Sequence, residues 1–478
     1  MAGTPRFGEI RCDGIAYAGL TRKFSGRRQP AVRAGRPLRP FQAMEIVRRP
    51  FGWLLDAPAA SRRTLLAASL GWMLDSFDIL LYAMVLPSLM VSLHLSKSVA
   101  GVLGSVTLVA AAAGGVVFGI AADRWGRTRA LMGSVLLYAV FTAACGLAWN
   151  WASLAVFRIM LGFGMGGEWA TGASLVAETW SAADRDKALG LMQSAFAIGY
   201  GLAAVVTFLL LPLVGWRGVF FAGLLPALLT VWIRRRVPES EAWLSARASL
   251  RAPRQSHDSR APGIRSLFRP PLRSRTVALS LMNACCMFAW WGFNLWVPSY
   301  LSMPAARGGI GFTSRTMTVI IAVMQCGMWL GYVSFGYLAT AFGRRRLYVT
   351  FLISAALLLA IFTRVHSPWV LVALGPVLAF AATGYFSGFA SVTAETYPTP
   401  IRSVGQGFTY NLGRLASAAA PYVVGALAER RGFSVAFHVD SAAFLAAAAL
   451  WIFLPDSPRG GFSHPRSALA EASPKQRR

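Results

Sequence analysis

Two carboxylates lie in the middle of an apolar stretch of the sequence, GWMLDSFDILLY (71–82). Asp75 and Asp78 are three positions apart, so a helix would place them one turn apart on the same face. Burial favours the protonated form of a carboxylic acid, and a neighbouring arginine favours the ionised form. A rearrangement that separates such an acid from its arginine would drive proton uptake, and this is the chemistry that the segment suggests.

Arg158 is a candidate partner for these acids. If the apolar stretches cross a hydrocarbon core of about 30 Å as helices rising about 1.5 Å per residue, Asp78 lies about 20 Å from the start of its stretch. Arg158 lies about 9 Å from the opposite surface, which is nearly the same depth. We therefore predict an Asp78–Arg158 pair in which Asp78 carries the proton, with Asp75 as the second candidate. A static pair that only fixes helix packing is the alternative.

Arg414 lies in YNLGRLAS (410–417), about 13 Å into a later apolar stretch, and the acid that most closely precedes it is Glu395. Its planar guanidinium can bind a carboxylate through two parallel hydrogen bonds. We expect it to bind an anionic substrate or, alternatively, to pair with Asp75 or Glu168. Uncharged polar and aromatic side chains complete the predicted substrate site: Asn283, Gln325, Asn411, Gln193, Trp291 and Tyr410.

The composition of the chain predicts the kind of secondary structure that holds these candidate site residues. Of the 478 residues, 55% are hydrophobic and 14% are charged, and the mean hydropathy is +0.51, which is typical of a membrane protein. Backbone groups in lipid must be satisfied within each segment, so long apolar stretches cross as helices. We therefore predict an all-α membrane protein with twelve transmembrane helices, at 65–92, 99–122, 129–148, 152–176, 188–214, 216–233, 276–303, 316–341, 347–363, 368–393, 405–428 and 434–454.

The basic residues predict the orientation of these helices. Residues 1–63 contain thirteen Lys or Arg against four acids, and residues 234–275 contain eleven Arg against three acids. The positive-inside rule puts both termini and the central loop in the cytoplasm, and we expect an inner membrane. The net charge of +28 thus reflects orientation rather than a nucleic-acid partner. The predicted division is a disordered basic N-terminal tail (1–60, or shorter if translation starts at Met44), a six-helix bundle (61–236), a cytoplasmic linker (237–273), a second six-helix bundle (274–456) and a disordered C-terminal tail (457–478).

The two predicted bundles repeat each other at a fixed offset of 217 residues. Because six helices return the chain to the same side, the second copy enters the membrane in the same direction as the first. Parallel repeats of this kind occur in secondary transporters, whose substrate site lies near the midplane between the halves. Several residue pairs keep the offset: Gly119 and Gly336, Glu178 and Glu395, Arg185 and Arg402.

Glu168 does not follow the repeat, since Tyr385 is the residue at the equivalent position. Its charge is therefore no requirement of the duplicated unit, and a buried charge in a membrane helix costs about 2.5–3.5 kcal/mol on insertion scales. We assign Glu168 to the proton-coupling residues, together with Asp75, Asp78 and Arg158.

The segment GIAADRWGRTR (119–129) resembles the loop signature of the major facilitator superfamily, and GYLATAFGRRR (336–346) is its degenerate second copy. Thr128 replaces the usual basic residue, and Thr340 stands where the first copy has an acid. The resemblance implies two six-helix halves that alternate between inward- and outward-facing states, with loop residues that latch or gate them. The predicted gating residues are Asp123, Arg124, Gly126, Arg127, Glu178, Arg185, Gly343, Arg344, Glu395 and Arg402.

Within that superfamily, residues 158–190, VPESEAW (237–243) and LDSFD (74–78) resemble the sialate:proton symporter family, which includes lactate and related carboxylate carriers. The resemblance implies that an acid of the first helix and an arginine of the fourth couple proton movement to transport. NACCMFAWWGFN (283–294) lacks the His, Gln and Asp of the fungal members' signature, which argues against lactate as the substrate.

We therefore predict a proton-coupled symporter that imports a small organic anion, such as a sialate-like acidic sugar or another carboxylate. A neutral sugar or polyol symporter, a drug or metabolite exporter and a sensor without flux are alternatives. No ATP-binding GK[ST] loop and no recognisable set of nucleophile and base is present, so we expect no enzyme activity, cofactor or metal. The expected partners are the small-molecule substrate, protons and the lipid bilayer, and the expected state is a monomer.

Overall fold

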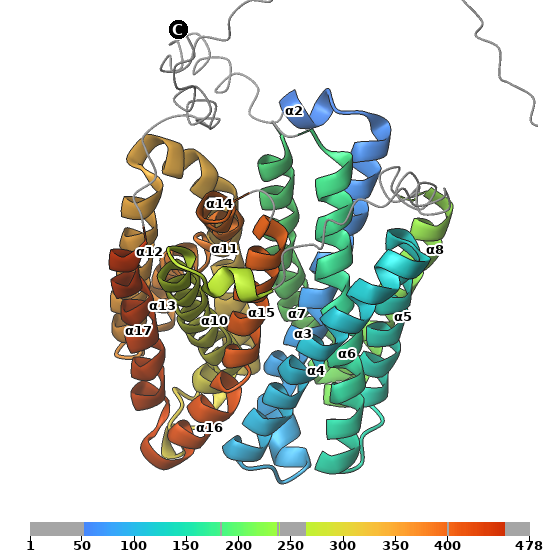
Figure 1. Ribbon diagram of the computed structural model, residues 1–478. Coiled ribbons are helices and arrows are strands. Elements are labelled where there is room, and N and C mark those ends of the chain that lie inside the picture. The colour runs from blue at the N-terminus through green and yellow to red at the C-terminus, as the bar shows by residue number, and fades with distance from the viewer. Residues whose placement is uncertain (1–51, 182–183, 237–238, 240–263, 399–400, 455–478) are drawn as a thin grey trace, which may run out of the picture. The chain divides into compact units, whose positions relative to one another are not determined.

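The apolar stretches of the sequence form long helices in the computed structural model, which describes residues 52–181, 184–236, 239, 264–398 and 401–454, apart from some side chains within the helices (Figure 1). The predicted C-terminal tail and most of the predicted N-terminal tail and linker lie outside the described residues. The described helices belong to one unit of the chain, Phe51–Ser457.

The helices of the first half follow one another in the order α2 (Gly52–Leu55), α3 (Ala59–Ser92), α4 (Lys97–Trp125), α5 (Arg127–Cys145), α6 (Trp151–Thr179), α7 (Arg185–Phe221), the short 3₁₀ helix η1 (Ala222–Leu224) and α8 (Leu225–Arg236). The second half contains η2 (Ile264–Phe268), α10 (Leu272–Ser302), η3 (Ala305–Arg307), α11 (Ser314–Phe342), α12 (Arg344–Phe362), α13 (Pro368–Thr383), α14 (Phe386–Thr396), α15 (Arg402–Ser417), α16 (Ala420–Arg431), α17 (Phe433–Ala449) and η5 (Leu450–Phe453).

Nine helical stretches of the described residues are long and apolar enough to cross a membrane. The other predicted stretches are helical as well. Residues 152–176 lie in α6, residues 216–233 span the end of α7, η1 and α8, and residues 405–428 span α15 and α16. The prediction of helices is therefore confirmed along the described chain.

Gly215 marks the boundary between the fifth and sixth predicted stretches, where the structure has one long helix, α7, with a kink. Its φ of 65° and ψ of −177° are not helical. A residue with a Cβ atom is strained at such a positive φ, whereas glycine is not. Pro212, one turn earlier in α7, lacks an amide hydrogen and weakens the helix at the same place. The two stretches are thus separate segments that meet at a glycine.

Glycines allow α4 and α6 to lie in close contact. A Cβ atom at Gly114 would collide with the carbonyl oxygen of Phe163, and one at Gly166 would collide with that of Ala111. Small residues of this kind let helix backbones approach closely in membranes, where packing rather than the hydrophobic effect holds helices together. The glycines of α6 therefore serve helix packing, which fixes the depth of the charged residues on the same helix.

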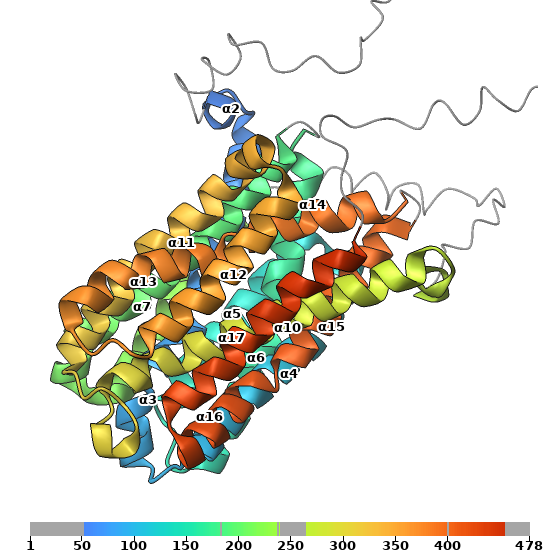
Figure 2. The same cartoon turned by 90° about the vertical axis from the view of Figure 1, so that its left-hand side faces the viewer.

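Helices α3–α8 and α10–α17 contact each other most extensively where α7 packs on α11, α4 on α16 and α3 on α10, and also where α4 meets α15 and α7 meets α14 (Figure 1, Figure 2). Helix α4 runs the length of the bundle, so its two ends define the two ends of this unit. We name the end at Lys97 the latch end and the end at Arg124 the basic end.

Candidate substrate and proton site

Three charged residues from three helices meet in the interior. Asp75 of α3 and Glu168 of α6 are fully buried, and Arg414 of α15 is only 7% exposed. Glu168 Oε1 lies against Gly71, one turn before Asp75 on α3, where no Cβ atom would fit. Asp75 and Glu168 interact electrostatically with each other and with Arg414. Two acids of the first half are therefore within electrostatic reach of one arginine of the second, and the alternative prediction that Arg414 pairs with one of them stays a prediction.

The carboxylate of Asp75 lacks hydrogen-bond donors in the described part of its own half. Neither of its carboxylate oxygens has a hydrogen-bond partner among the described residues. A buried carboxylate without donors or a nearby cation carries a large desolvation cost. Arg414 is therefore the group that makes an ionised Asp75 tolerable, and the interaction couples the two halves of the molecule.

Asp78 and Arg158 have separate partners instead of each other. Asp78 Oδ2 accepts a hydrogen bond of 3.0 Å from Thr142 Oγ1. The guanidinium carbon of Arg158 lies 3.7 Å from the centre of the Tyr82 ring, and its Nε donates to the carbonyl of Leu103 over 3.2 Å. Tyr82 is one turn beyond Asp78 on α3. The guanidinium of Arg158 therefore lies at the level of Tyr82 and not at the level of the Asp78 carboxylate. The predicted ion pair is not formed between these two described residues in this conformation, and their part in proton coupling stays a prediction.

A small cavity of about 50 Å³ lies beside Arg414 and has aromatic walls. Trp290 is one of the lining residues, in edge-to-face contact with Trp291 at 4.9 Å and with Phe196 at 5.4 Å between ring centroids. One water needs about 10–15 Å³ of such space, so the cavity holds a few waters, and a substrate requires the halves to move apart. The lining residues are Trp72, Met165, Gln193, Phe196, Met287, Trp290, Trp291, Tyr332, Phe386, Tyr410 and Arg414.

The predicted polar residues divide into one that lines this cavity and three that do not. Gln193 lines the wall and is hydrogen-bonded to Tyr332 of the other half. Asn283 is buried and donates to the carbonyl of Thr409, which ties α10 to α15. Gln325 and Asn411 each donate to a carbonyl of their own helix, and Asn411 is exposed. Their substrate-binding role stays a prediction, but the structure places these three away from the cavity wall.

Residues 68–307 and 301–477 match the family model described as Major Facilitator Superfamily. The chain belongs to the major facilitator superfamily. It is therefore a multi-pass membrane transporter of a small-molecule substrate and not an enzyme, and the predicted family and all-helical fold are confirmed.

Known relatives of this transporter match it over almost their whole length. It is 33% identical to the "Probable 4-methylmuconolactone transporter" of Cupriavidus pinatubonensis, over 86% of this chain and 94% of that protein. It is 28% identical to the sialic acid transporter NanX of Escherichia coli, over 84% and 95% respectively. The crystal structure of a D-xylose-proton symporter has the same fold, with a TM-score of 0.66 and 20% identity over 83% of this chain and 98% of the other.

The signature loops of the transporter turn at glycines. Gly126 has a φ of 111° and Gly343, 217 positions later, has a φ of 86°; both conformations favour glycine. Arg127 forms an ion pair of 3.4 Å with Glu178 of the same half. The carboxylate of Glu239 accepts hydrogen bonds from the first backbone amides of α5, including that of Arg127 at 2.8 Å, where a negative charge is favoured by the helix dipole.

Other predicted gating residues are also at the basic end. The side chains of Arg124 and Arg185 are exposed, and Arg344 begins α12. The side chains of Asp123, Glu395 and Arg402 lie outside the described residues. Among the described gating residues, the ion pair of Arg127 thus links two elements of one half, and a role of these residues in gating between the halves stays a prediction.

The latch end is held by contacts between α4 and α16 that the sequence did not predict. Lys97 Nζ donates to the carbonyls of Arg307 at 2.6 Å and Ala428 at 3.1 Å, and it lies 4.7 Å from the centre of the Phe433 ring. Arginine and lysine bonds to backbone carbonyls leave no pattern in a sequence, because every residue has a carbonyl. This is why reasoning from residue types missed the contact.

Glu429 completes what we name the latch, which consists of Lys97, Ser98 and Glu429. Its carboxylate accepts hydrogen bonds from the backbone amide of Ser98, at 2.9 Å, and from the Ser98 hydroxyl. Ser98 is in the first turn of α4, where the helix dipole favours a carboxylate. Glycines of α4 pack closely against Pro421 of α16 just below. The latch therefore holds the two halves together at this end.

Removing the latch should open this end of the transporter. In the double variant Lys97→Met/Glu429→Gln, we expect the population separated at the latch end to rise about tenfold, because hydrogen bonds to charged groups contribute about 1.5–3 kcal/mol. Spin labels at Val102 and Tyr422, two exposed positions on α4 and α16, would report the separation by pulsed electron paramagnetic resonance.

The control is Lys187→Met, which removes an exposed ion pair of 2.9 Å with Asp184 within the first half and should leave the label distances unchanged. Identical distance distributions in the double variant and the unmodified chain would show that the latch does not hold the halves together.

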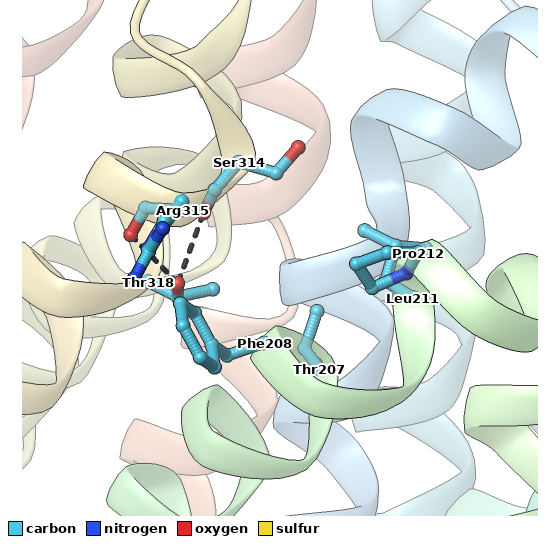
Figure 3. Close-up of a pocket in the computed structure, with 7 residues that line it drawn as sticks. All are labelled: Thr207, Phe208, Leu211, Pro212, Ser314, Arg315 and Thr318. Atoms are coloured by element: carbon cyan, nitrogen blue, oxygen red, sulfur yellow. Dashed lines mark hydrogen bonds between the residues drawn. The ribbon is translucent and has the colours of Figure 1, made fainter.

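A second pocket, of about 240 Å³, lies between α7 and α11 and shares no lining residue with the central cavity. Figure 3 shows Phe208 and Thr207 on one side and Arg315 and Thr318 on the other. The Arg315 guanidinium lies 5.6 Å from the Phe208 ring centre, and Thr318 Oγ1 donates to the carbonyls of Ser314 and Arg315. Because Arg315 is exposed, this pocket is a surface feature, and we place the substrate site at the buried charges.

Proposed function

We propose that this transporter is a proton-coupled symporter that imports a small organic anion, with a planar carboxylate as the substrate class favoured by the cavity. The observation that carries the proposal is the meeting of Asp75, Glu168 and Arg414 beside a cavity with aromatic walls. A guanidinium there can bind a carboxylate, and two acids within electrostatic reach of it can bind protons.

The charges of the cluster couple the substrate to the proton. Arg414 balances one of the two acids, so the cluster is neutral when the other acid is protonated. A substrate carboxylate bound to Arg414 adds one negative charge, and neutrality returns when the second acid also takes up a proton. Substrate and proton therefore favour each other's binding, which is the thermodynamic requirement for symport. The count gives one proton taken up by this cluster with each monovalent anion.

The latch and the basic loops support an orientation for this cycle. The positive-inside rule indicates that the basic end faces the cytoplasm. In an inner membrane the latch then closes the side of the transporter that faces away from the cytoplasm. Substrate would then enter when the latch opens and leave on the cytoplasmic side after α4 and α16 have closed again. Release of the proton there would restore the interaction of Arg414 with Asp75.

Aromatic rings favour flat substrates. Trp72, Trp290 and Trp291 present ring faces and edges rather than hydroxyl or amide groups, so a planar carboxylate gains contact area with little loss of hydrogen bonding to water. The relatives named for 4-methylmuconolactone and for sialic acid support an acidic substrate. A polyhydroxylated acid such as sialate would leave more polar groups unsatisfied against these walls.

Uptake into proteoliposomes tests the proposal. The panel contains benzoate, sialate, lactate and glucose, each with and without an inward proton gradient. We expect uptake of benzoate to be stimulated by the gradient more than that of sialate, and lactate and glucose to be poor substrates. Gradient-stimulated uptake of glucose alone, or efflux of bulky apolar compounds only, would overturn the organic-anion assignment and favour a sugar symporter or an exporter.

A further inference from the structure

Asp440 of α17 is a buried carboxyl that the mechanism above does not use. Its side chain is fully buried, and neither oxygen has a hydrogen-bond partner among the described residues. Oδ1 lies directly over Gly292 of α10, in space that a Cβ atom would fill. An ionisable group in a membrane helix is costly and is a candidate for function rather than packing alone.

The internal repeat relates Asp440 to the first half. Gly292 is 217 positions after Asp75, and Asp440 is 217 positions after Gly223. The first and sixth segments of each half thus carry one aspartate and one glycine at equivalent positions, with the two residues exchanged. In the first half Gly223 also faces a carboxyl, because its Cβ atom would lie 3.2 Å from Asp78 Oδ1. Each half therefore has a carboxyl group that faces a glycine across the same helix interface.

No charged side chain stands near Asp440 in the described part of the chain. Its surroundings act on it through burial alone, and no hydrogen bond or ion pair joins it to any ionisable group of the described helices packed against α17, the free thiols of Cys285 and Cys286 on α10 included. Tyr300 of α10 donates to a backbone carbonyl, and Tyr348 of α12 packs against other aromatic rings. Glu429 of α16 belongs to the latch, and His438 of α17 is exposed.

We propose that Asp440 is a second proton-binding site, which accepts and releases a proton as α10 moves against α17 during transport. Helix α10 carries Trp290 and Trp291 in the wall of the central cavity, immediately before Gly292. A movement of α10 that admits substrate also moves Gly292, against which the Asp440 carboxyl packs. The packing around Asp440 therefore changes during the transport cycle. The inference rests on the proposed proton coupling, to which it adds a site in the second half.

Asp440→Asn tests the proposal, because asparagine keeps the shape of the acid but cannot exchange a proton. Benzoate uptake and proton entry, read by an internal pH-sensitive dye, are measured in the same proteoliposomes. We expect protons per benzoate to fall about twofold, since the Asp75–Glu168 cluster still binds one, and the pH dependence of uptake to change. The matched control is Ser441→Ala, a buried neighbour on the same helix, which should behave as the unmodified chain. An unchanged proton ratio and pH profile in Asp440→Asn would overturn the proposal.

A labelling experiment decides the question even if that variant does not fold. Dicyclohexylcarbodiimide reacts with protonated carboxyl groups in apolar surroundings, and peptide mass spectrometry of the full chain locates the adduct. We expect Asp440 to be modified at acidic pH and several-fold less at alkaline pH. Equal modification at acidic and alkaline pH would show that Asp440 is permanently protonated and serves only in packing. Because this readout needs no transport, a chain without gradient-stimulated uptake would contradict the proposed function and leave the titration of Asp440 separately measurable.

Discussion

Arg414→Gln should reduce binding of a carboxylate substrate by roughly ten- to a hundred-fold. Hydrogen bonds to charged groups contribute about 1.5–3 kcal/mol, and about 1.4 kcal/mol corresponds to a factor of ten in affinity. Arg414 is the cationic member among the residues that line the described central cavity. Glutamine keeps one donor but removes the positive charge that balances Asp75 and Glu168. Transport of the anion should fall at least as far as binding.

Tryptophan fluorescence of the purified transporter measures this effect directly. Trp72, Trp290 and Trp291 line the cavity, so benzoate binding should change their emission. Arg414→Lys keeps the charge without the planar fork and should lie between the unmodified chain and Arg414→Gln. Arg315→Gln is the matched control, because it removes an exposed arginine from the other pocket and should leave the affinity unchanged. Affinity within about twofold of normal in Arg414→Gln would mean that the arginine only pairs with the acids.

A double variant separates these two roles of Arg414. If the arginine only neutralises Asp75, then Asp75→Asn should restore to Arg414→Gln most of the stability and substrate exchange that it lost, because the charge left unpaired by the loss of Arg414 is also removed. If Arg414 also binds the substrate carboxylate, the double variant should regain stability without regaining affinity. Thermal unfolding and fluorescence titration of the same preparations distinguish these results.

The position of each helix could be predicted from the sequence, but the direction of its side chains could not. Hydropathy located the stretch around Arg158, and depth along the membrane placed it level with Asp78. The depth of a residue does not determine how its helix is rotated or which rotamer a long side chain adopts. The Arg158 guanidinium stacks on Tyr82, one helical turn from Asp78. The same uncertainty affects Asn411, which has the predicted depth but is exposed.

For a related reason, the sequence could not decide whether Arg414 binds an anionic substrate or pairs with Asp75 or Glu168. Asp75 and Glu168 are on helices of the first half, and nothing in the order of residues says which helix of the second half faces them. The repeat offset of 217 was more informative, because backbone conformation follows it. Gly126 and Gly343 both have a positive φ at the equivalent turn. A duplicated unit constrains the turns, whereas the buried charges depart from the repeat, as Glu168 does with Tyr385 at its equivalent position.

Asp75→Asn should remove the proton that the buried cluster couples to transport, while leaving exchange of substrate intact. A proton moving down a gradient of one pH unit supplies about 1.4 kcal/mol, which is about tenfold accumulation of the substrate. Asparagine cannot take up that proton, so we expect this accumulation to be lost. Exchange of external for internal benzoate needs no net proton movement and should continue. Uptake by the unmodified chain should rise as the external pH falls, and that of the variant should rise less.

Asp78→Asn is the matched comparison, since the sequence favours Asp78 as the proton carrier and the structure favours Asp75. Asp78 accepts a hydrogen bond from Thr142, which an asparagine oxygen can also accept, and the charged group it faces is Asp75 rather than Arg414. We therefore expect a smaller loss of accumulation in Asp78→Asn than in Asp75→Asn. The reverse order would return the coupling role to Asp78 and require Arg158 to leave Tyr82 during transport. An unimpaired gradient response in both variants would exclude the acids of α3 and leave Glu168 as the member of the cluster that takes up the proton.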